Sequence, residues 1–290
     1  MSTLQVLRPH CRDQPRTQDD LNVTERHPGR RLELMDWQTL QLQAARARST
    51  VLWPFGAIEQ HGPHLPLATD ALFADRVADA VLARLEEDLP IWRLPLQSLG
   101  FSPEHQGFAG TLSLPAEWII TLVVTIGGDL EAAGFKRLVL FNAHGGQIAL
   151  LEVAARQLRL HHPRLAVLPC FLWRGAEGIG DLLPEPERSL GLHAGLAETS
   201  LMLHLEPDLV GSDRRADATH LQAPPAGWSL EGPSPCAWLT REISSSGVIG
   251  DPSQAEAGLG GELYERLVSG WKSRLEGLLR SDWPPTPDGQ

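Results

Sequence analysis

The sequence predicts an α/β protein with a mostly parallel central sheet and helices on both faces of that sheet. Short, nearly unbroken apolar runs alternate along the chain with longer segments that carry apolar residues at helical spacing. Unbroken apolar runs are typical of parallel strands that are covered on both faces. The polar clusters of the chain each follow one of these runs, which favours strands joined by crossover helices with a site at one sheet edge.

Four apolar runs are the expected strands, and each is short enough to cross a sheet once. They are STVLWPFGA at 49–57, IWRLPLQSL at 91–99, KRLVLFNA at 136–143 and RLAVLPCFLW at 164–173.

Helices are expected at 70–87, 116–134 and 147–161, and a last one near 255–279. Asp70 stands where the first of them needs an N-cap, and Gly134 is a typical helix stop. The stretch 206–255 is irregular, so we expect long loops there that lie over the site.

Composition bounds the classes of function. The formal charge of −11 over 290 residues argues against nucleic acid as a partner, because such binding relies on clustered Lys and Arg. No run of about 18 apolar residues appears, so no membrane span is expected. The three cysteines form no CxxC pair, which argues against a disulfide framework or a thiolate zinc site.

The two ends of the chain differ from the rest in composition. Residues 1–30 are polar and lack the apolar core of a signal peptide, so we expect a disordered arm and a cytoplasmic protein. Residues 281–290 are expected to be a disordered tail. A single domain is then expected over 31–280.

Each polar cluster follows an expected strand. EQHGPHLPLATD comes after the first, SPEHQGFAGT after the second, NAHGGQ after the third and GLHAGLAET after the fourth. In doubly wound sheets ligands bind outside the carboxyl ends of the strands, so these clusters are expected to meet in one crevice.

Two carboxylates and two imidazoles in these clusters form a possible metal-binding set. Glu59 and His61 are two residues apart, Asp70 follows, and His144 comes from the third strand. Such ligands suit Zn²⁺, Mn²⁺ or Fe²⁺. The spacing matches no short zinc motif, so a structural role for each residue stays open: Asp70 as a helix cap and a histidine as a hydrogen-bonded group.

Five stretches together resemble the creatininase (creatinine amidohydrolase) family. PFGAIEQHGPHLPLATD resembles the family's signature, and SPEHQGFAGTLSL, FNAHGGQ, HAGLAETSLML and SGVIGDPSQA resemble its further motifs in the family's order, over roughly 35–275. The resemblance implies a three-layer αβα fold, an assembly that is often hexameric, and a pair of divalent metal ions.

By this resemblance, Glu59 and His144 would hold one metal ion, His61 would hold the second, and Asp70 would bridge both. Creatininase itself has a Glu where this chain has Gly146. The second ion therefore needs another carboxylate.

Four further residues receive expected roles from the resemblance. Glu198 is the expected remaining ligand, and if it is not one, it is the first candidate for the general base. His193 matches a candidate general acid, with orientation of a ligand as the alternative. Glu104 and His105 would contact the substrate or a neighbouring subunit.

The resemblance implies a metal-dependent amidohydrolase that hydrolyses a C–N amide bond of a small or peptide-like substrate with a water activated by two divalent ions (Zn, Mn or Fe). The motifs look closer to the mycofactocin-associated creatininase-like peptidases and the formamide deformylases than to creatininase proper. A homo-oligomer, possibly a hexamer, is expected.

Two alternatives belong to other classes. The replacements at Ala57, Ala143 and Gly146 motivate a non-catalytic metal- or ligand-binding protein. A structural scaffold, with partner contacts from residues 1–30 and 206–255, is the other alternative.

Overall fold

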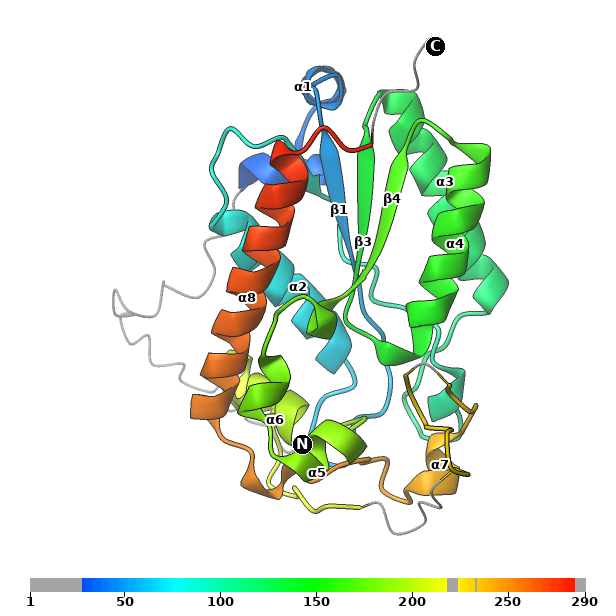
Figure 1. Cartoon of the computed structure of the whole chain (residues 1–290), viewed down its shortest axis with the longest axis vertical. Coiled ribbons are helices and arrows are strands. Elements are labelled where there is room, and N and C mark those ends of the chain that lie inside the picture. The colour runs from blue at the N-terminus through cyan, green and yellow to red at the C-terminus, as the bar shows by residue number, and fades with distance from the viewer. Residues whose placement is uncertain (1–27, 218–223, 233, 285–290) are drawn as a thin grey trace, which may run out of the picture.

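The computed structural model describes residues 28–217, 224–232 and 234–284 (Figure 1). Most of the expected arm at 1–30 and of the expected tail at 281–290 lies outside these ranges. Hydrogen bonds hold Arg30, near the start of the described chain, in place. Arg30 is buried, and its Nη1 donates to the carbonyls of Leu89 and Ile91 at 3.0 and 2.9 Å.

A four-stranded parallel sheet lies at the centre of the fold. Its strands are β1 (Thr50–Phe55), β2 (Ile91–Arg93), β3 (Arg137–Asn142) and β4 (Ala166–Phe171), in the order β2-β1-β3-β4. Every neighbouring pair is parallel. The four expected strands are therefore confirmed.

The second strand is shorter than the expected 91–99. It ends at Arg93, and Pro95, which has no N–H to donate, follows two residues later. The chain nevertheless stays beside β1, because the backbone N–H groups of Leu94 and Gln97 donate to β1 at 3.0 and 2.9 Å.

Helices cover both faces of the sheet, which gives three layers (Figure 1). One apolar core joins one sheet face to α2 (Thr69–Ala83), α6 (Leu196–Leu205) and α8 (Ala257–Arg280). A second core joins the other face to α3 (Ala116–Ala133) and α4 (Ile148–His161), with α1 (Trp37–Ala44) at its border. The expected αβα architecture is thus confirmed.

The helix boundaries differ from expectation in two informative places. The residue before α2 is Ala68, so Asp70 is the second residue of the helix and not its cap. Its carboxylate is therefore available for other partners. The helix α6 was not expected, because the stretch that begins it had been assigned only to a polar cluster. Gly134 does end α3, with φ of 110°.

Within the described part of 206–255, the chain is mostly irregular. It holds α7 (Thr240–Ile243) and two 3-10 turns, Pro207–Leu209 and Pro252–Gln254, and Leu230, Trp238 and Leu239 from this stretch line the main cavity. The expected loops over the site are confirmed. Among the described helices, none is long and apolar enough to cross a bilayer.

Candidate metal centre

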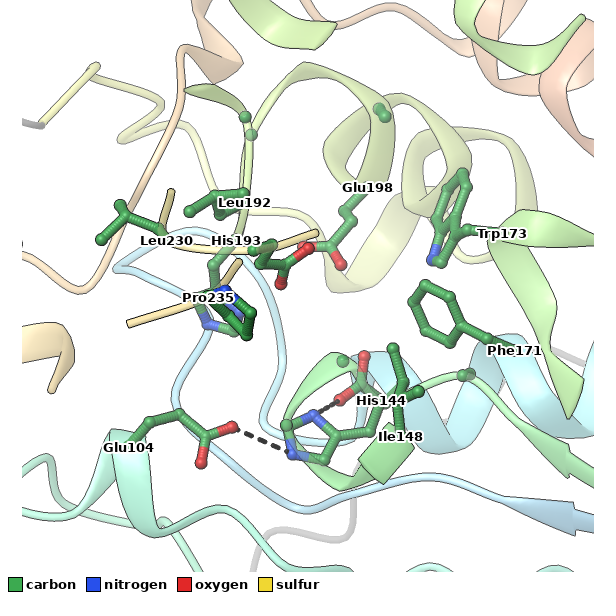
Figure 2. A pocket seen from close by; sticks show the side chains of 18 of the residues that line it. Glu104, His144, Ile148, Phe171, Trp173, Leu192, His193, Glu198, Leu230 and Pro235 are labelled. Atoms are coloured by element: carbon green, nitrogen blue, oxygen red, sulfur yellow. Dashed lines mark ion pairs between the residues drawn. The ribbon is translucent and has the colours of Figure 1, made fainter. Parts of the chain in front are cut away.

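A cavity of about 820 Å³ opens at the carboxyl ends of the strands (Figure 2). Residues from the loops after β1, β2, β3 and β4 line it, together with residues from 230–232 and 235–239. The strand-end clusters therefore meet in one place, as the order of the motifs predicted.

The loop after β1 is held by its backbone. The N–H of Glu59 donates to the Leu67 carbonyl at 2.9 Å, and the N–H of Leu112 donates to the Ile58 carbonyl at 2.8 Å. Gly62 turns the chain with φ of 65°, a conformation that favours glycine. These contacts keep the polar side chains of an irregular loop in fixed positions.

Glu59, Asp70 and His144 form the first donor group, and all three side chains are buried. Nδ1 of His144 lies 3.1 Å from Oδ2 of Asp70 and 3.3 Å from Oε1 of Glu59. The structure thus brings together the residues that the resemblance assigned to one metal ion.

His61, Asp70 and Glu198 form the second donor group. Nε2 of His61 lies 3.5 Å from Oδ1 of Asp70, so the two oxygens of Asp70 face different imidazoles. Glu198 comes from α6, and its Oε2 accepts a hydrogen bond from the Ala194 N–H at 2.7 Å. The carboxylate that the sequence could place only by analogy therefore lies at the same centre.

The donor atoms fit a divalent cation. Both Oε atoms of Glu59, Nε2 of His61 and Oδ2 of Asp70 are buried side-chain atoms that make no hydrogen bond to any described residue. A buried polar atom without a partner costs roughly 1–3 kcal/mol, and four at one place need an explanation. Carboxylate oxygens and imidazole nitrogens at these distances are the ligands that Zn²⁺ and Mn²⁺ take.

The pKa shifts show that the cluster attracts positive charge. Burial disfavours the charged His61 ring, but the combined attraction of the Asp70, Glu198 and Glu59 carboxylates outweighs burial and raises the pKa of His61 to about 9. Burial also opposes ionisation of Asp70, yet the His61 and His144 rings hold the pKa of Asp70 well below its usual range. The same field would favour a metal cation.

Two other carboxyl groups of the cluster, those of Glu59 and Glu198, have raised pKa values. Burial is the main cause of the raised pKa of Glu59, and repulsion from Asp70 adds to it. Burial likewise raises the pKa of Glu198 to about 7. A cation between these groups would offset both costs.

Glu104 and His105 lie beside the donor groups. Oε1 of Glu104 is 3.3 Å from Nε2 of His144 (Figure 2), and Nε2 of His105 is 3.4 Å from Oε1 of Glu59. A Cβ atom at Gly146 would lie only 1.6 Å from that Glu104 oxygen. Glu104 therefore fills the space that a side chain at position 146 would need.

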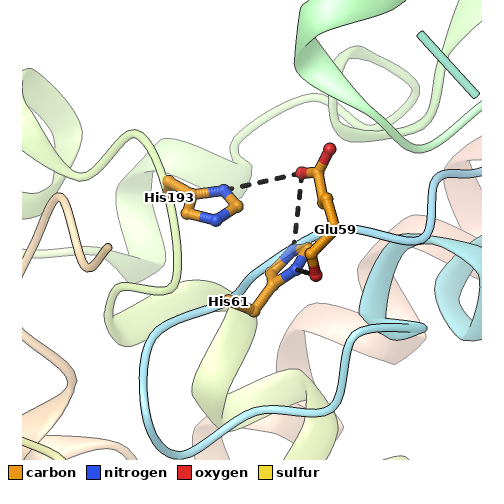
Figure 3. Close-up of side chains that lie close together, drawn as sticks. All are labelled: Glu59, His61 and His193. Atoms are coloured by element: carbon orange, nitrogen blue, oxygen red, sulfur yellow. Dashed lines mark hydrogen bonds and ion pairs between the residues drawn. The ribbon is translucent and has the colours of Figure 1, made fainter. Parts of the chain in front are cut away.

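His193 faces the cluster with one nitrogen and the backbone with the other. Its Nε2 donates to the Gln60 carbonyl at 2.7 Å, while its Nδ1 lies 3.9 Å from Oε1 of Glu59 (Figure 3). Burial lowers the pKa of His193 well below its usual range, and repulsion from His105 and His61 adds to this. The neutral ring therefore presents a lone pair on Nδ1 to the site.

Sequence reasoning missed Gln60 as a functional residue. It stands between Glu59 and His61 and is buried, and it bonds to both His105 and His193. Its position inside the EQH triplet was the only signal in the sequence, because its partners are far away along the chain.

The family model described as "Creatinine amidohydrolase" matches residues 33–275. The chain is 37% identical over 245 residues to the mycofactocin precursor peptide peptidase of Mycobacterium ulcerans (strain Agy99), covering 83% of this chain and 88% of that protein. It is 27% identical over 266 residues to the creatinine amidohydrolase of Pseudomonas putida, covering 87% and 96%.

Solved structures agree with these sequence matches. The manganese form of creatininase superposes with a TM-score of 0.69 at 25% identity, covering 87% of this chain and 99% of that one. A putative creatinine amidohydrolase from Bacteroides fragilis, at 21% identity, superposes with a TM-score of 0.71 and shares the fold. The extent of the family match and the shared motifs lead to one conclusion: this chain belongs to the creatininase (creatinine amidohydrolase) family.

Proposed function

We propose that the chain is a divalent-metal-dependent amidohydrolase that cleaves a C–N amide bond in a peptide or peptide-like substrate. One observation carries the proposal: the two oxygens of Asp70 face two separate donor groups. Glu59 and His144 lie on one side, and His61 and Glu198 lie on the other. This arrangement supports a centre in which Asp70 bridges two ions.

Ions held by these residues would polarise an amide carbonyl and lower the pKa of a water molecule. His193 would then act first as a base, because its neutral ring has the lone pair on Nδ1. It would take a proton from the attacking water as the C–O bond forms. The same ring would return this proton to the departing nitrogen as the C–N bond breaks, so the expected acid role follows a base step.

The walls of the cavity support a peptide-like substrate. Phe171, Trp173 and Trp238 line it, and about 820 Å³ is more than one small cyclic amide would fill. The relatives at 36–37% identity are named peptidases, whereas the named creatinine amidohydrolase is 27% identical. Gly146 also lacks the carboxylate that creatininase has at this position.

Hydrolysis assays test the proposal directly. The full chain, loaded in turn with Zn²⁺, Mn²⁺ and Fe²⁺, is incubated with short peptides, formamides and creatinine, and products are identified by mass spectrometry. We expect cleavage of a peptide amide bond. Saturable binding of one compound without hydrolysis of any would instead support the non-catalytic binding protein.

Asp70→Ala provides the decisive variant. We expect it to lose both metal uptake and hydrolysis, because it removes the group shared by the two donor sets. Asp129→Ala, an exposed acid on α3, is the matched control and should keep both. Elemental analysis that found two equivalents of metal in Asp70→Ala would contradict the bridging role.

A further inference from the structure

Gln60 uses every polar atom of its side chain. Oε1 accepts a hydrogen bond from the Gly62 N–H at 2.9 Å, and Nε2 donates to the Gly247 carbonyl at 3.2 Å. A backbone N–H can only donate and a carbonyl can only accept, so these two contacts fix which end of the amide is nitrogen. The same Nε2 lies 2.8 Å from Nδ1 of His105.

The space around this amide fits it closely. Gly247 has φ of 89°, and a Cβ atom there would lie 1.8 Å from Oε1 of Gln60. The segment after α7 therefore comes near enough to bond the amide only because residue 247 is a glycine.

The amide decides where the proton of His105 sits. An amide nitrogen can only donate, so Nδ1 of His105 must accept, and the neutral ring carries its hydrogen on Nε2. Thr240 Oγ1 also lies 2.8 Å from this Nδ1, but a hydroxyl can donate or accept and so decides nothing. The nitrogen that carries this hydrogen, Nε2, lies 3.4 Å from Oε1 of Glu59.

The backbone of Gln60 controls the second imidazole. Its carbonyl accepts from Nε2 of His193, which leaves the lone pair of that ring on Nδ1. The rings of His105 and His193 stack with centroids 4.1 Å apart. Two stacked imidazoles thus present opposite groups, a donor and an acceptor, to the same Glu59 oxygen.

We propose that Gln60 is the positioning residue of this centre: its side chain places the ring hydrogen of His105 on Nε2, the nitrogen that faces Glu59, and its carbonyl leaves the lone pair of the neutral His193 ring on Nδ1. The consequence for catalysis rests on the proposed amidohydrolase function and deepens it. The location of the two ring protons does not depend on that function. An N–H that faces a metal-binding carboxylate favours its ionised form, and loss of such an outer partner typically weakens metal binding about 10–100-fold.

Nitrogen NMR of the full chain, labelled with ¹⁵N-histidine, tests the ring protons without any substrate. His105 and His193 are assigned by replacing each in turn among the 11 histidines, in metal-free and Zn²⁺-loaded protein. We expect both rings to be neutral with hydrogen on Nε2. Hydrogen on Nδ1 of His105 in the wild type would overturn the proposal.

Two variants separate Gln60 from its neighbour. Gln60→Met removes the amide, so His105 should lose its uniform Nε2–H form, while His193 should not change because its partner is a backbone carbonyl. Thr240→Val is the matched control and should leave both rings as in the wild type. If the ring hydrogen of His105 stayed on Nε2 in Gln60→Met, or moved in Thr240→Val, a group other than Gln60 would determine its position, and the proposal would be wrong.

Zn²⁺ titration by calorimetry tests the link to Glu59. Gln60→Met and His105→Phe should each weaken Zn²⁺ binding about 10–100-fold, and the double variant should weaken it no further, because both act through the Nε2–H of His105. Additive losses or unchanged affinity would contradict that link. Since no substrate is present, failure of this result is distinct from failure of the hydrolysis assays.

Discussion

Glu198 is a site residue for which the structure supports two roles. The sequence left it as either a metal ligand or a general base, and the structure puts its carboxylate beside His61 and Asp70. Burial raises the pKa of Glu198 to about 7, which also suits a base near neutral pH. The two roles therefore need an experiment that counts metal ions.

Glu198→Gln distinguishes them, because it keeps the shape and removes the charge. We expect the variant to lose about one equivalent of metal and most of its activity, since a neutral amide is a weak replacement for a carboxylate ligand. Elemental analysis and the hydrolysis rate are measured on the same sample. Two equivalents retained with activity lost would assign Glu198 as the base instead.

The short 3-10 turn after β3, Gly145–Gln147, shows how an element shapes the site. Gly146 leaves room for Glu104 to approach Nε2 of His144. The Phe101 carbonyl, 3.0 Å from the same nitrogen, gives the ring a further acceptor. A ligating histidine is commonly oriented by such an acceptor on its other nitrogen.

Gly146→Ala should therefore displace Glu104 and weaken Zn²⁺ binding about 10-fold, measured by calorimetry. Gly145→Ala is the matched control, because a Cβ there meets only Glu231 at an ordinary 3.6 Å. Equal losses in both variants would mean that the turn, and not Glu104, matters.

Glu131 in the last turn of α3 ties two elements together. Its Oε1 accepts from the Arg164 N–H at 2.7 Å, and its Oε2 lies 3.2 Å from Nδ1 of His162, beyond the end of α4. Burial opposes its ionisation, but these hydrogen bonds outweigh burial and lower the pKa of Glu131. The folded state therefore stabilises the ionised form of Glu131 relative to the unfolded chain.

The sign of the pH effect follows from this. A depressed folded-state pKa adds stability above the unfolded pKa of the group and loses it as pH falls through the folded value. Glu131→Gln should lower the free energy of unfolding by about 1 kcal/mol at pH 7, and the difference should shrink in acid. Urea unfolding at pH 7 and pH 3.5 measures it, and a gap that widens in acid would contradict the assignment.

The elements differ in how readily the sequence reveals them. Strands such as Thr50–Phe55 were predictable because burial on both faces leaves an unbroken apolar run. The helix Leu196–Leu205 was missed because its buried residues, which include Thr199 and Ser200, mix polar and apolar types and are spread around the helix. The sequence of this helix therefore shows no amphipathic period.

At the scale of the whole molecule, the strand order brings four distant loops to one edge, so the site could be located from the sequence. Its hydrogen bonds could not be, because the partners of Gln60 at Gly247 and His105 meet it only after the fold forms. The expected homo-oligomer stays a prediction. Trp37 and Trp118, exposed by 71% and 63%, are the kind of surface that an assembly covers.

Metal binding should also stabilise the entire fold, because the donor residues come from distant segments. Glu59 and His61 lie in the loop after β1, and His144 follows β3. Asp70 and Glu198 lie on α2 and α6. A ligand that binds only the folded chain stabilises it by about 2.7 kcal/mol at 100 times its dissociation constant.

For a domain of this size, that gain corresponds to an increase in Tm of about 5–10 °C. Differential scanning calorimetry of chelator-treated protein, with and without added Zn²⁺, should detect the increase in the wild type. Asp70→Ala should show no metal-dependent shift, because it lacks the residue common to both donor groups. A wild-type Tm that does not respond to saturating metal would mean that these buried carboxylates are held by the protein alone.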